Sequence, residues 1–319
     1  MTTGQRVAQY DRYGPPSVLY VATAPIPTPK PGEAVVRVHA ASISGGDVTA
    51  RSGAMRMVTG RKFPQRTGVD FAGVVEHSAG PTEFRVGDAV WGVMPHFEFG
   101  SVAQYVTVPG QRLARAPVNV ALRDAAALPA SGTTAITALK DKARLREGER
   151  LLVRGASGGV GSVLVQLGKA LGANVTALAG GSSLEFVRSI GADDAHDYRT
   201  TGPSQLGRYD VIVDVVGTDL GVYRHLLTNG GRMVPLAFDA AHLSRSILIT
   251  MGWTAVHPRS FLPFSNNPTR DTLTALSGLV EAGAVTPIVA QYFSLDRVAE
   301  AHQALERGGV RGKYVVETT

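Results

Sequence analysis

Arg154-Gly155-Ala156-Ser157-Gly158-Gly159-Val160-Gly161 is the most informative run in this sequence of 319 residues. It follows a short apolar run, Leu151-Leu152-Val153, and precedes a segment with helical apolar spacing from Ser162 to Leu171. A second apolar run, Val175 to Leu178, completes the pattern of a βαβ unit. Small residues at a strand-to-helix turn let backbone N–H groups approach a pyrophosphate, and the helix N-terminus adds partial positive charge.

The run matches the dinucleotide-binding pattern G-x-G-x-x-G with one departure. Ala156 stands at the first glycine position, while Gly158 and Gly161 occupy the second and third. A glycine-rich turn that only packs a helix onto a sheet is the alternative, and the flanking strand, helix and second strand disfavour it. We therefore expect six residues to bind a dinucleotide pyrophosphate: Ala156, Ser157, Gly158, Gly159, Val160 and Gly161.

The end of the second apolar run bears on which dinucleotide binds. An NAD-preferring site places Asp or Glu there to bind the ribose 2′-hydroxyl, but here the chain reads Leu178-Ala179-Gly180-Gly181-Ser182-Ser183. Side chains that can receive a 2′-phosphate are Ser182, Ser183, Arg188, Tyr198 and Arg199. The sequence therefore favours NADPH. Alternatively, the two serines cap the next helix, which is compatible with phosphate binding at that point.

The remaining pattern predicts an α/β protein with two domains. Up to about residue 120, short alternating runs are broken by Gly and Pro, which is typical of an antiparallel β domain. From residue 121, strands alternate with longer helical segments, as in a doubly wound parallel sheet. A helical segment at 295–307 and a strand at 314–316 close the chain. We expect residues 1–120 with 286–319 to form one domain and residues 121–285 the dinucleotide-binding domain.

Composition restricts the chemistry. Apolar residues make up 44% of the chain and charged residues 18%, as in ordinary globular proteins. Neither a membrane-spanning run nor the apolar core of a signal peptide is evident, so we expect a cytoplasmic protein. The absence of cysteine excludes disulfides, thiolate metal sites and thiol nucleophiles.

The formal charge of +6 raises the possibility of a polyanionic partner. The arginines, however, are scattered singly, without a basic run interleaved with aromatic residues, which argues against nucleic-acid binding. Strongly salt-dependent retention on a polyanion would be the sign of such binding. A mildly basic surface also attracts a phosphorylated cofactor.

Together these motifs identify a family resemblance that runs from about Arg6 to Glu317. The chain resembles the medium-chain dehydrogenase/reductase superfamily, in its zinc-independent quinone oxidoreductase (zeta-crystallin-like) branch. Besides the glycine run, the matching segments are Pro31-Gly32-Glu33, Val36-Arg37-Val38, Asp47 with Arg51-Ser52-Gly53, Gly68-Val69-Asp70-Phe71-Ala72-Gly73-Val74-Val75, Val86-Gly87-Asp88-Ala89-Val90, Leu128-Pro129-Ala130-Ser131-Gly132-Thr133-Thr134-Ala135, Asp214-Val215-Val216-Gly217 and Arg311-Gly312-Lys313. The resemblance implies a GroES-like β domain from both chain ends, a Rossmann domain between them, and a homodimer.

The resemblance also implies roles for single residues. It places Thr134 beside the nicotinamide and Tyr198 at the 2′-phosphate, with Ser183 where many relatives have Lys. Val216 and Arg311 fall in family segments expected to contact the cofactor. Zinc-dependent relatives carry Cys near position 44 and Gly-His-Glu at 68–70, where this chain has Ser44 and Gly68-Val69-Asp70, so no metal site is expected.

The catalytic side departs from the family at several positions. Ser44 replaces the usual Asn, and the branch's active-site tyrosines fall on Thr49 and Met55, so the enoyl reductases' tyrosine proton donor is not retained. Met55 and Met57 are expected as apolar pocket wall. Without zinc, an oxyanion needs hydrogen-bond donors or a positioned water, and the candidates are Ser44, Thr49 and Ser131. Asp47 is expected to orient loop groups, with general acid catalysis through water as the alternative.

The reaction these residues suggest is hydride transfer from NADPH to a quinone or other conjugated carbonyl. An enone or enoyl reductase that tailors a biosynthetic intermediate, for example a polyketide, is the alternative of the same class. A non-catalytic NADPH-binding sensor or structural protein is the alternative of another class. The segment from Arg245 to Asn267, rich in Trp, Phe and Pro, is expected either to line the acceptor pocket or to form a dimer or core surface.

Overall fold

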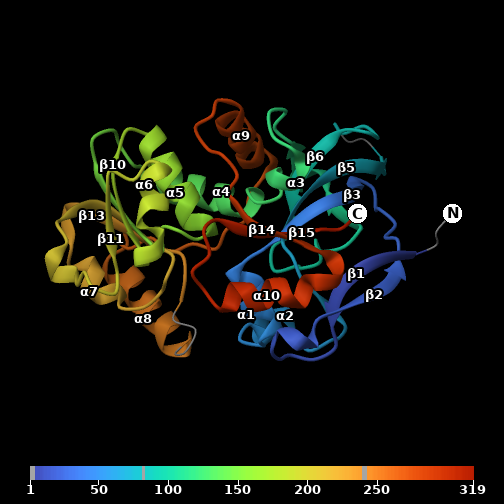
Figure 1. The fold of residues 1–319 in the computed structure, drawn as a ribbon, viewed down its shortest axis with the longest axis horizontal. Helices are drawn as coiled ribbons and strands as arrows, with labels where there is room; N and C mark the ends of the chain where they lie inside the picture. The colour runs from blue at the N-terminus through green and yellow to red at the C-terminus, as the bar shows by residue number, and fades with distance from the viewer. Residues whose placement is uncertain (1–3, 81–82, 239–242) are drawn as a thin grey trace. The chain divides into compact units, whose positions relative to one another are not determined.

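The structure, a computed structural model, describes residues 4–80, 83–238 and 243–319, and the side chains of 243–245 are not described. The described chain divides into two compact units. Unit 1 comprises the chain up to Thr133 with 267–283 and 287–319, and unit 2 comprises 134–266 with 284–286. Figure 1 shows the elements of both units.

Unit 2 is built on a parallel sheet with the strand order β11-β10-β9-β12-β13. The strands are β9 (Arg150–Arg154), β10 (Asn174–Ala179), β11 (Asp194–Asp197), β12 (Tyr209–Asp214) and β13 (Leu227–Pro235). Its central strands are apolar because a parallel sheet is covered on both faces, and Leu151, Leu152 and Val153 are completely buried. The order reverses between β9 and β12, and such a reversal marks the ligand-binding edge of a doubly wound sheet. The expected Rossmann fold is confirmed.

The helices of unit 2 precede, connect or follow these parallel strands. They are the π-helix η3 (Thr137–Lys142), α5 (Gly159–Ala170), α6 (Leu184–Ser189), α7 (Leu220–Arg224) and α8 (Leu243–Val256), with the 3-10 helices η4 (Gly181–Ser183) and η5 (Pro203–Gln205). α5 packs on β9 and β10, as expected for the crossover helix of the βαβ unit.

Unit 1 contains two sheets within the described residues. The smaller has the order β2-β1-β4, and the larger has the order β14-β15-β3-β5-β6-β8, with β7 also paired to β3. The strands are β1 (Gly4–Tyr10), β2 (Tyr20–Pro25), β3 (Glu33–Ile43), β4 (Gln65–Arg66), β5 (Asp70–Ser78), β6 (Ala89–Val93), β7 (Tyr105–Pro109), β8 (Leu113–Arg115), β14 (Val289–Ser294) and β15 (Lys313–Glu317). Strands β3, β5, β6 and β8 pair in antiparallel fashion, which confirms the GroES-like domain.

The last strand joins the first part of the chain, as expected. In Figure 1, red β15 lies beside blue β3, and Tyr314 pairs with Ile43 in antiparallel register. The helices of unit 1 are α1 (Gly45–Arg51), α2 (Arg56–Thr59), α3 (Leu122–Ala125), α9 (Arg270–Glu281) and α10 (Val298–Glu306), with the 3-10 helices η1 (Pro16–Val18), η2 (Gly110–Arg112) and η6 (Leu295–Arg297). α4 (Pro129–Ile136) carries the chain from unit 1 into unit 2.

The limits of the two units differ from the expected domain boundaries at two places. Residues 121–133 and 267–283 group with unit 1, although the sequence pattern suggested the Rossmann domain for both. The second segment forms α9, which packs against β8. The Ser277 hydroxyl donates a hydrogen bond of 2.7 Å to the Arg115 carbonyl oxygen. Helical periodicity shows that α9 has a buried face, but not which sheet buries it.

Candidate functional site

The glycine run of unit 2 forms a tight turn between β9 and α5. The N–H groups of Gly155 and Ala156 donate to the Leu178 carbonyl oxygen, at 3.0 and 3.2 Å, which ties the turn to β10. A Cβ built on Gly161 would lie 2.1 Å from the Gly155 carbonyl oxygen, so only glycine permits this approach. The turn therefore needs glycine at the third position of the pattern for backbone packing alone.

The same turn presents a helix N-terminus that suits an anion. Gly158 is the N-cap of α5, and the first helical hydrogen bond runs from the Ser162 N–H to the Gly158 carbonyl oxygen at 2.8 Å. The N–H groups of the first helical residues therefore have no intrahelical acceptor. Ala156 is buried, whereas residues 157–160 are partly exposed. A Cβ built on Gly158 would lie 3.7 Å from the Gly155 carbonyl oxygen, an ordinary van der Waals contact, so a side chain here meets no close backbone atom. These features fit a dinucleotide pyrophosphate.

The end of β10 carries a basic and aromatic lining. A Cβ built on Gly180 would lie 3.7 Å from Tyr198 Cε1 and 3.8 Å from Arg199 Nη1. The Arg199 guanidinium lies over the Tyr198 ring, 5.2 Å from its centroid. Ser182 is exposed and Ser183 is buried, both in η4. Four of the residues expected from the sequence at a 2′-phosphate therefore surround one strand end.

Two further charged residues near that strand end are held by the backbone. The Arg188 guanidinium donates to the Ala195 carbonyl oxygen at 3.0 Å, which holds the Arg188 side chain against β11. Asp197 accepts the Arg199 N–H at 3.0 Å, and its Oδ2 would lie 2.6 Å from a Cβ built on Gly181. Asp197 thus closes the turn that presents Arg199, a role the sequence analysis missed.

The loop after β12, which contains Val216, is organised by a buried carboxylate. Asp214 Oδ1 accepts the N–H groups of Val216 and Gly217, at 2.9 and 2.7 Å, and its other oxygen pairs with Arg154. Burial raises the pKa of Asp214, while the Arg154 guanidinium opposes that shift. Val216 itself is 42% exposed. This pair was not expected from the sequence, although a polar residue at the end of a buried strand was a usable signal.

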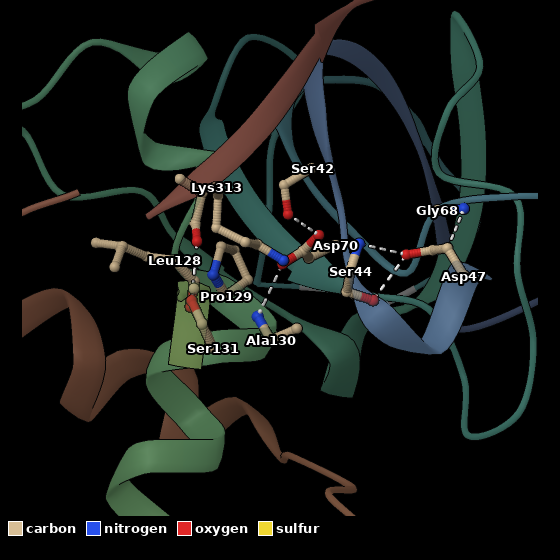
Figure 2. A network of polar contacts seen from close by, with 12 residues as sticks. Ser42, Ser44, Asp47, Gly68, Asp70, Leu128, Pro129, Ala130, Ser131 and Lys313 are labelled. Carbon is tan, nitrogen blue, oxygen red and sulfur yellow. Dashed lines mark hydrogen bonds and ion pairs between the residues drawn. The ribbon is translucent and has the colours of Figure 1, made fainter. Parts of the chain in front are cut away.

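Asp47 of unit 1 is a buried acceptor that receives donors from two segments (Figure 2). Its Oδ2 accepts the N–H and the hydroxyl of Ser44, at 2.8 and 2.7 Å, and its Oδ1 accepts the Gly68 N–H at 2.6 Å. Ser44 is the N-cap of α1 and Asp47 its third residue, so the S-x-x-D spacing is a capping box. The geometry suits an orienting role for Asp47.

A buried histidine extends this network on the side away from Ser44. Arg51 Nε donates to His302 Nδ1 at 3.4 Å, so the ring hydrogen lies on Nε2, which is 3.2 Å from the Thr67 hydroxyl oxygen. Thr67 in turn donates to Asp47 Oδ1 at 3.3 Å. Burial, aided by the Arg51 charge, lowers the pKa of His302 to about 3, so the ring is neutral.

Asp70 and Lys313 form a second buried polar group, also drawn in Figure 2. Lys313 Nζ is 3.6 Å from Asp70 Oδ2, and the Ser42 hydroxyl donates to Asp70 Oδ1 at 2.5 Å. The Ala130 N–H, in α4, donates to Asp70 Oδ2 at 3.2 Å. Burial raises the pKa of Asp70, and the Lys313 charge opposes it. The pair joins β5, β15 and α4, and the sequence analysis assigned it no role.

The three hydroxyl candidates share one property. Ser44 donates its hydroxyl hydrogen to Asp47, Thr49 donates to the Gly45 carbonyl oxygen at 2.7 Å, and Ser131 donates to the Ala127 carbonyl oxygen at 2.8 Å. A hydroxyl has a single hydrogen, so an oxyanion must displace an internal acceptor or bind through water. Ser131 is buried, whereas Ser44 and Thr49 are partly exposed.

The remaining expected residues belong to different elements of the two units. Thr134 belongs to α4 in unit 2, whereas Arg311 is an exposed residue before β15 in unit 1. Met55 caps α2, and Met57 on the same helix is 95% exposed, so its side chain does not line a described cavity. The described part of 245–267 forms most of α8 and a bridge from Phe261 to Met233 beside β13.

Neither a metal cluster nor a membrane helix is found in the described ranges. Among residues 4–80, 83–238 and 243–319, His, Cys, Asp and Glu do not gather in a group of three that could hold a metal ion. In that same part of the chain, no helix combines the length and apolarity needed to cross a bilayer.

Comparisons with known proteins agree with this architecture. Residues 30–118 match the family model for the alcohol dehydrogenase GroES-like domain, and residues 190–316 match one described as zinc-binding dehydrogenase. The chain is 33% identical to the mitochondrial NAD(P)H oxidoreductase RTN4IP1 of Bos taurus, over 96% of this chain and 87% of that protein. It is 31% identical to the 2-methylene-furan-3-one reductase of Solanum lycopersicum, over 96% of this chain and 77% of that protein.

A solved structure of a quinone oxidoreductase has the same fold as this chain. The quinone oxidoreductase from Coxiella burnetii superimposes with a TM-score of 0.90 at 26% identity, covering 99% of this chain and 100% of that one. The chain therefore belongs to the medium-chain dehydrogenase/reductase superfamily, in its quinone oxidoreductase-like branch, which confirms the resemblance. The family model that matches residues 190–316 is described as zinc-binding, although this chain contains no cysteine.

Proposed function

We propose that this protein is an NADPH-dependent, zinc-independent oxidoreductase that reduces a quinone or another conjugated carbonyl compound. The turn at 155–161 is the observation that carries the proposal, because its partly exposed helix N-terminus fits a pyrophosphate. The strand end at Gly180 lacks a side-chain carboxylate on β10 and is lined by Tyr198 and Arg199, which supports NADPH over NADH. The names of the bovine and Coxiella burnetii relatives support the same reaction class.

The protein's own part in this reaction is to hold and orient. Backbone N–H groups at 159–161 bind the pyrophosphate, and Ser182, Ser183, Tyr198 and Arg199 receive the 2′-phosphate. Thr134, Val216 and Arg311 are proposed as further cofactor contacts. When bound, the reduced nicotinamide supplies the hydride.

Negative charge that develops on the acceptor oxygen is stabilised by ordered water held on Ser44, Thr49 and Ser131. Each of these hydroxyl hydrogens is already donated within the protein, and a bridging water lets the hydroxyl keep its internal acceptor. Asp47 positions Ser44 and the start of α1 rather than transferring a proton, since four donors converge on its two oxygens.

Steady-state NADPH oxidation tests the proposal, with 1,4-benzoquinone, a 2-alkenal and an enoyl thioester as acceptors in parallel. Fastest turnover with the quinone supports the proposal. Preference for the alkenal or thioester supports the second candidate, an enone or enoyl reductase, which the relationship to the tomato 2-methylene-furan-3-one reductase favours. Tight NADPH binding without oxidation by any of the three would contradict both enzymes and indicate a sensor or structural protein.

Subunit number and compartment are part of the same proposal. We expect a homodimer, to be measured by sedimentation equilibrium of the purified chain. We also expect a cytoplasmic location, to be measured by fractionation of cells that produce the full chain. The bovine relative is named as mitochondrial and a quinone-oxidoreductase homolog of Spinacia oleracea as chloroplastic, so the compartment differs within the family.

A further inference from the structure

An apolar cavity of about 550 Å³ lies within unit 2, beside α8. That volume falls in the range of about 300–1,000 Å³ that holds small molecules. Its walls come from the end of β13 and the residues after it, one face of α8, and the segment that follows the Phe261 bridge. The described lining residues are Pro235, Leu236, Phe238, Ile247, Thr250, Met251, Thr254, Ala255, Pro263, Phe264 and Ser265, none of which is charged.

The cavity adjoins the edge of the sheet where the dinucleotide turn lies. The Leu236 N–H donates to the Asp214 carbonyl oxygen at 2.8 Å, which fixes the exit from β13 to the end of β12. A Cβ built on Gly217 would lie 2.6 Å from the Phe238 carbonyl carbon, so the Val216 loop contacts the cavity wall directly. Ligands of doubly wound sheets bind outside the carboxyl ends of the strands, and Pro235 at the end of β13 lines this cavity.

Thr250 is the one polar group of the lining with an unmet hydrogen-bonding requirement among the described residues. It is 5% exposed, and its hydroxyl oxygen has no partner in the described chain. Thr254, one turn further along α8, donates its hydroxyl hydrogen to the Thr250 carbonyl oxygen at 2.7 Å and is therefore satisfied. A buried hydroxyl without a partner costs free energy, and a ligand oxygen can recover it.

We infer that this cavity binds the hydrocarbon part of a lipophilic carbonyl compound, with a ligand oxygen on the Thr250 hydroxyl. A neutral ligand is required because the lining contains aromatic and aliphatic side chains and no charge. A size of several carbons follows from the volume. That the cavity binds such a molecule follows from the cavity alone. That this molecule is the acceptor substrate rests on the proposed function.

Binding is tested first without nucleotide, so that no reaction occurs. Calorimetric titration with 2-butanone, 2-hexanone and 2-octanone should show affinity rising by up to about fourfold for each added methylene. The variant A255F places a ring in the lining and should abolish the dependence on chain length. Equal affinities for the three ketones in the unaltered protein would overturn the inference.

The two threonines of α8 provide a matched pair. T250V should weaken 2-octanone binding about fivefold, because it removes a neutral hydrogen bond, while leaving the midpoint of thermal unfolding unchanged or higher. T254V should leave 2-octanone affinity within about twofold, because that hydroxyl hydrogen is not available to a ligand. Equal losses in both variants would contradict the role of Thr250.

Turnover then separates this inference from the proposed function. With 1,4-benzoquinones of increasing alkyl length, KM should fall as the tail grows, and A255F should remove that trend. Ketone binding without any NADPH oxidation would overturn the proposed function and leave the cavity assignment standing. Oxidation that ignores tail length, together with absent ketone binding, would overturn the cavity assignment alone. If A255F instead changes only the sedimentation coefficient, the cavity is a contact between two copies of the chain, which also overturns it.

Discussion

The turn at 155–161 and the network around Asp47 and Asp70 hold polar groups in opposite ways. The turn presents backbone N–H groups at a helix N-terminus, and residues 157–160 are partly exposed. The network is buried, and Asp47 and Asp70 receive donors from within the protein. Open backbone donors suit ligand binding, whereas satisfied buried side chains suit the positioning of loops. Substitutions in the turn should therefore weaken NADPH binding, whereas substitutions in the network should lower the free energy of unfolding.

The largest expected effect comes from breaking the buried pair of unit 1. Asp70→Asn leaves the Lys313 ammonium buried without its carboxylate, and the free energy of unfolding should fall by about 3–5 kcal/mol. Urea denaturation measures this. Replacing both partners, by Asp70→Asn with Lys313→Met, should recover part of the loss because neither charge is then buried. A double variant as unstable as the single one would show that the ion pair is not the cause.

Glycine substitutions in the turn should act next most strongly, and differently from each other. Gly161→Ala forces a Cβ against the Gly155 carbonyl oxygen and should cost about 1–3 kcal/mol of stability as well as NADPH binding. In Gly158→Ala the added Cβ meets no such atom. The free energy of unfolding should fall by at most about 1 kcal/mol, because alanine is a poorer N-cap, while NADPH binding is still weakened. Thermal melts and calorimetric NADPH titrations compare the two. Unchanged NADPH affinity in both would remove the turn from the binding site.

Cofactor choice gives a smaller and more selective effect. Ser182→Asp puts a carboxylate into η4 at the end of β10, and NADPH affinity should fall about tenfold through repulsion of the 2′-phosphate. NADH affinity should change little, because it carries a hydroxyl at that position. Ser182→Ala is the control for loss of the hydroxyl alone. An equal effect of Ser182→Asp on both dinucleotides would refute the assignment of this loop.

Near neutral pH, the smallest effect is a pH dependence of stability through His302. Because the folded pKa is about 3 and the ordinary value is 6.5, the unfolded chain binds the proton first as the pH falls. Stability is therefore greatest above about pH 6.5, declines by about 1 kcal/mol between pH 6.5 and pH 5.5, and continues to decline to about pH 3. Urea denaturation at several pH values should show this decline, and His302→Gln should reduce it. An identical slope in the variant would exclude His302 as its source.

Much of unit 2 follows from local pattern. The strand, glycine turn, helix and second strand are contiguous between Arg150 and Ala179, so periodicity and turn chemistry predict them together. Unit 1 was less predictable. The partners of Asp47 lie at 44, 67 and 68, and those of Asp70 at 42, 130 and 313, so the spacing of residues does not reveal their contacts. Only the Ser44–Asp47 capping box had a local signal.

The sequence alone determined the class of fold, the glycine turn at 155–161 and the absence of thiol chemistry, because each depends on nearby residues or on composition. Tertiary structure decided which hydroxyl hydrogens are already donated, which acids are buried against a cation, and that α9 packs in unit 1. It also placed the unsatisfied Thr250 hydroxyl in an apolar cavity. These features depend on contacts between segments distant in the chain, whose distances and desolvation no local pattern records.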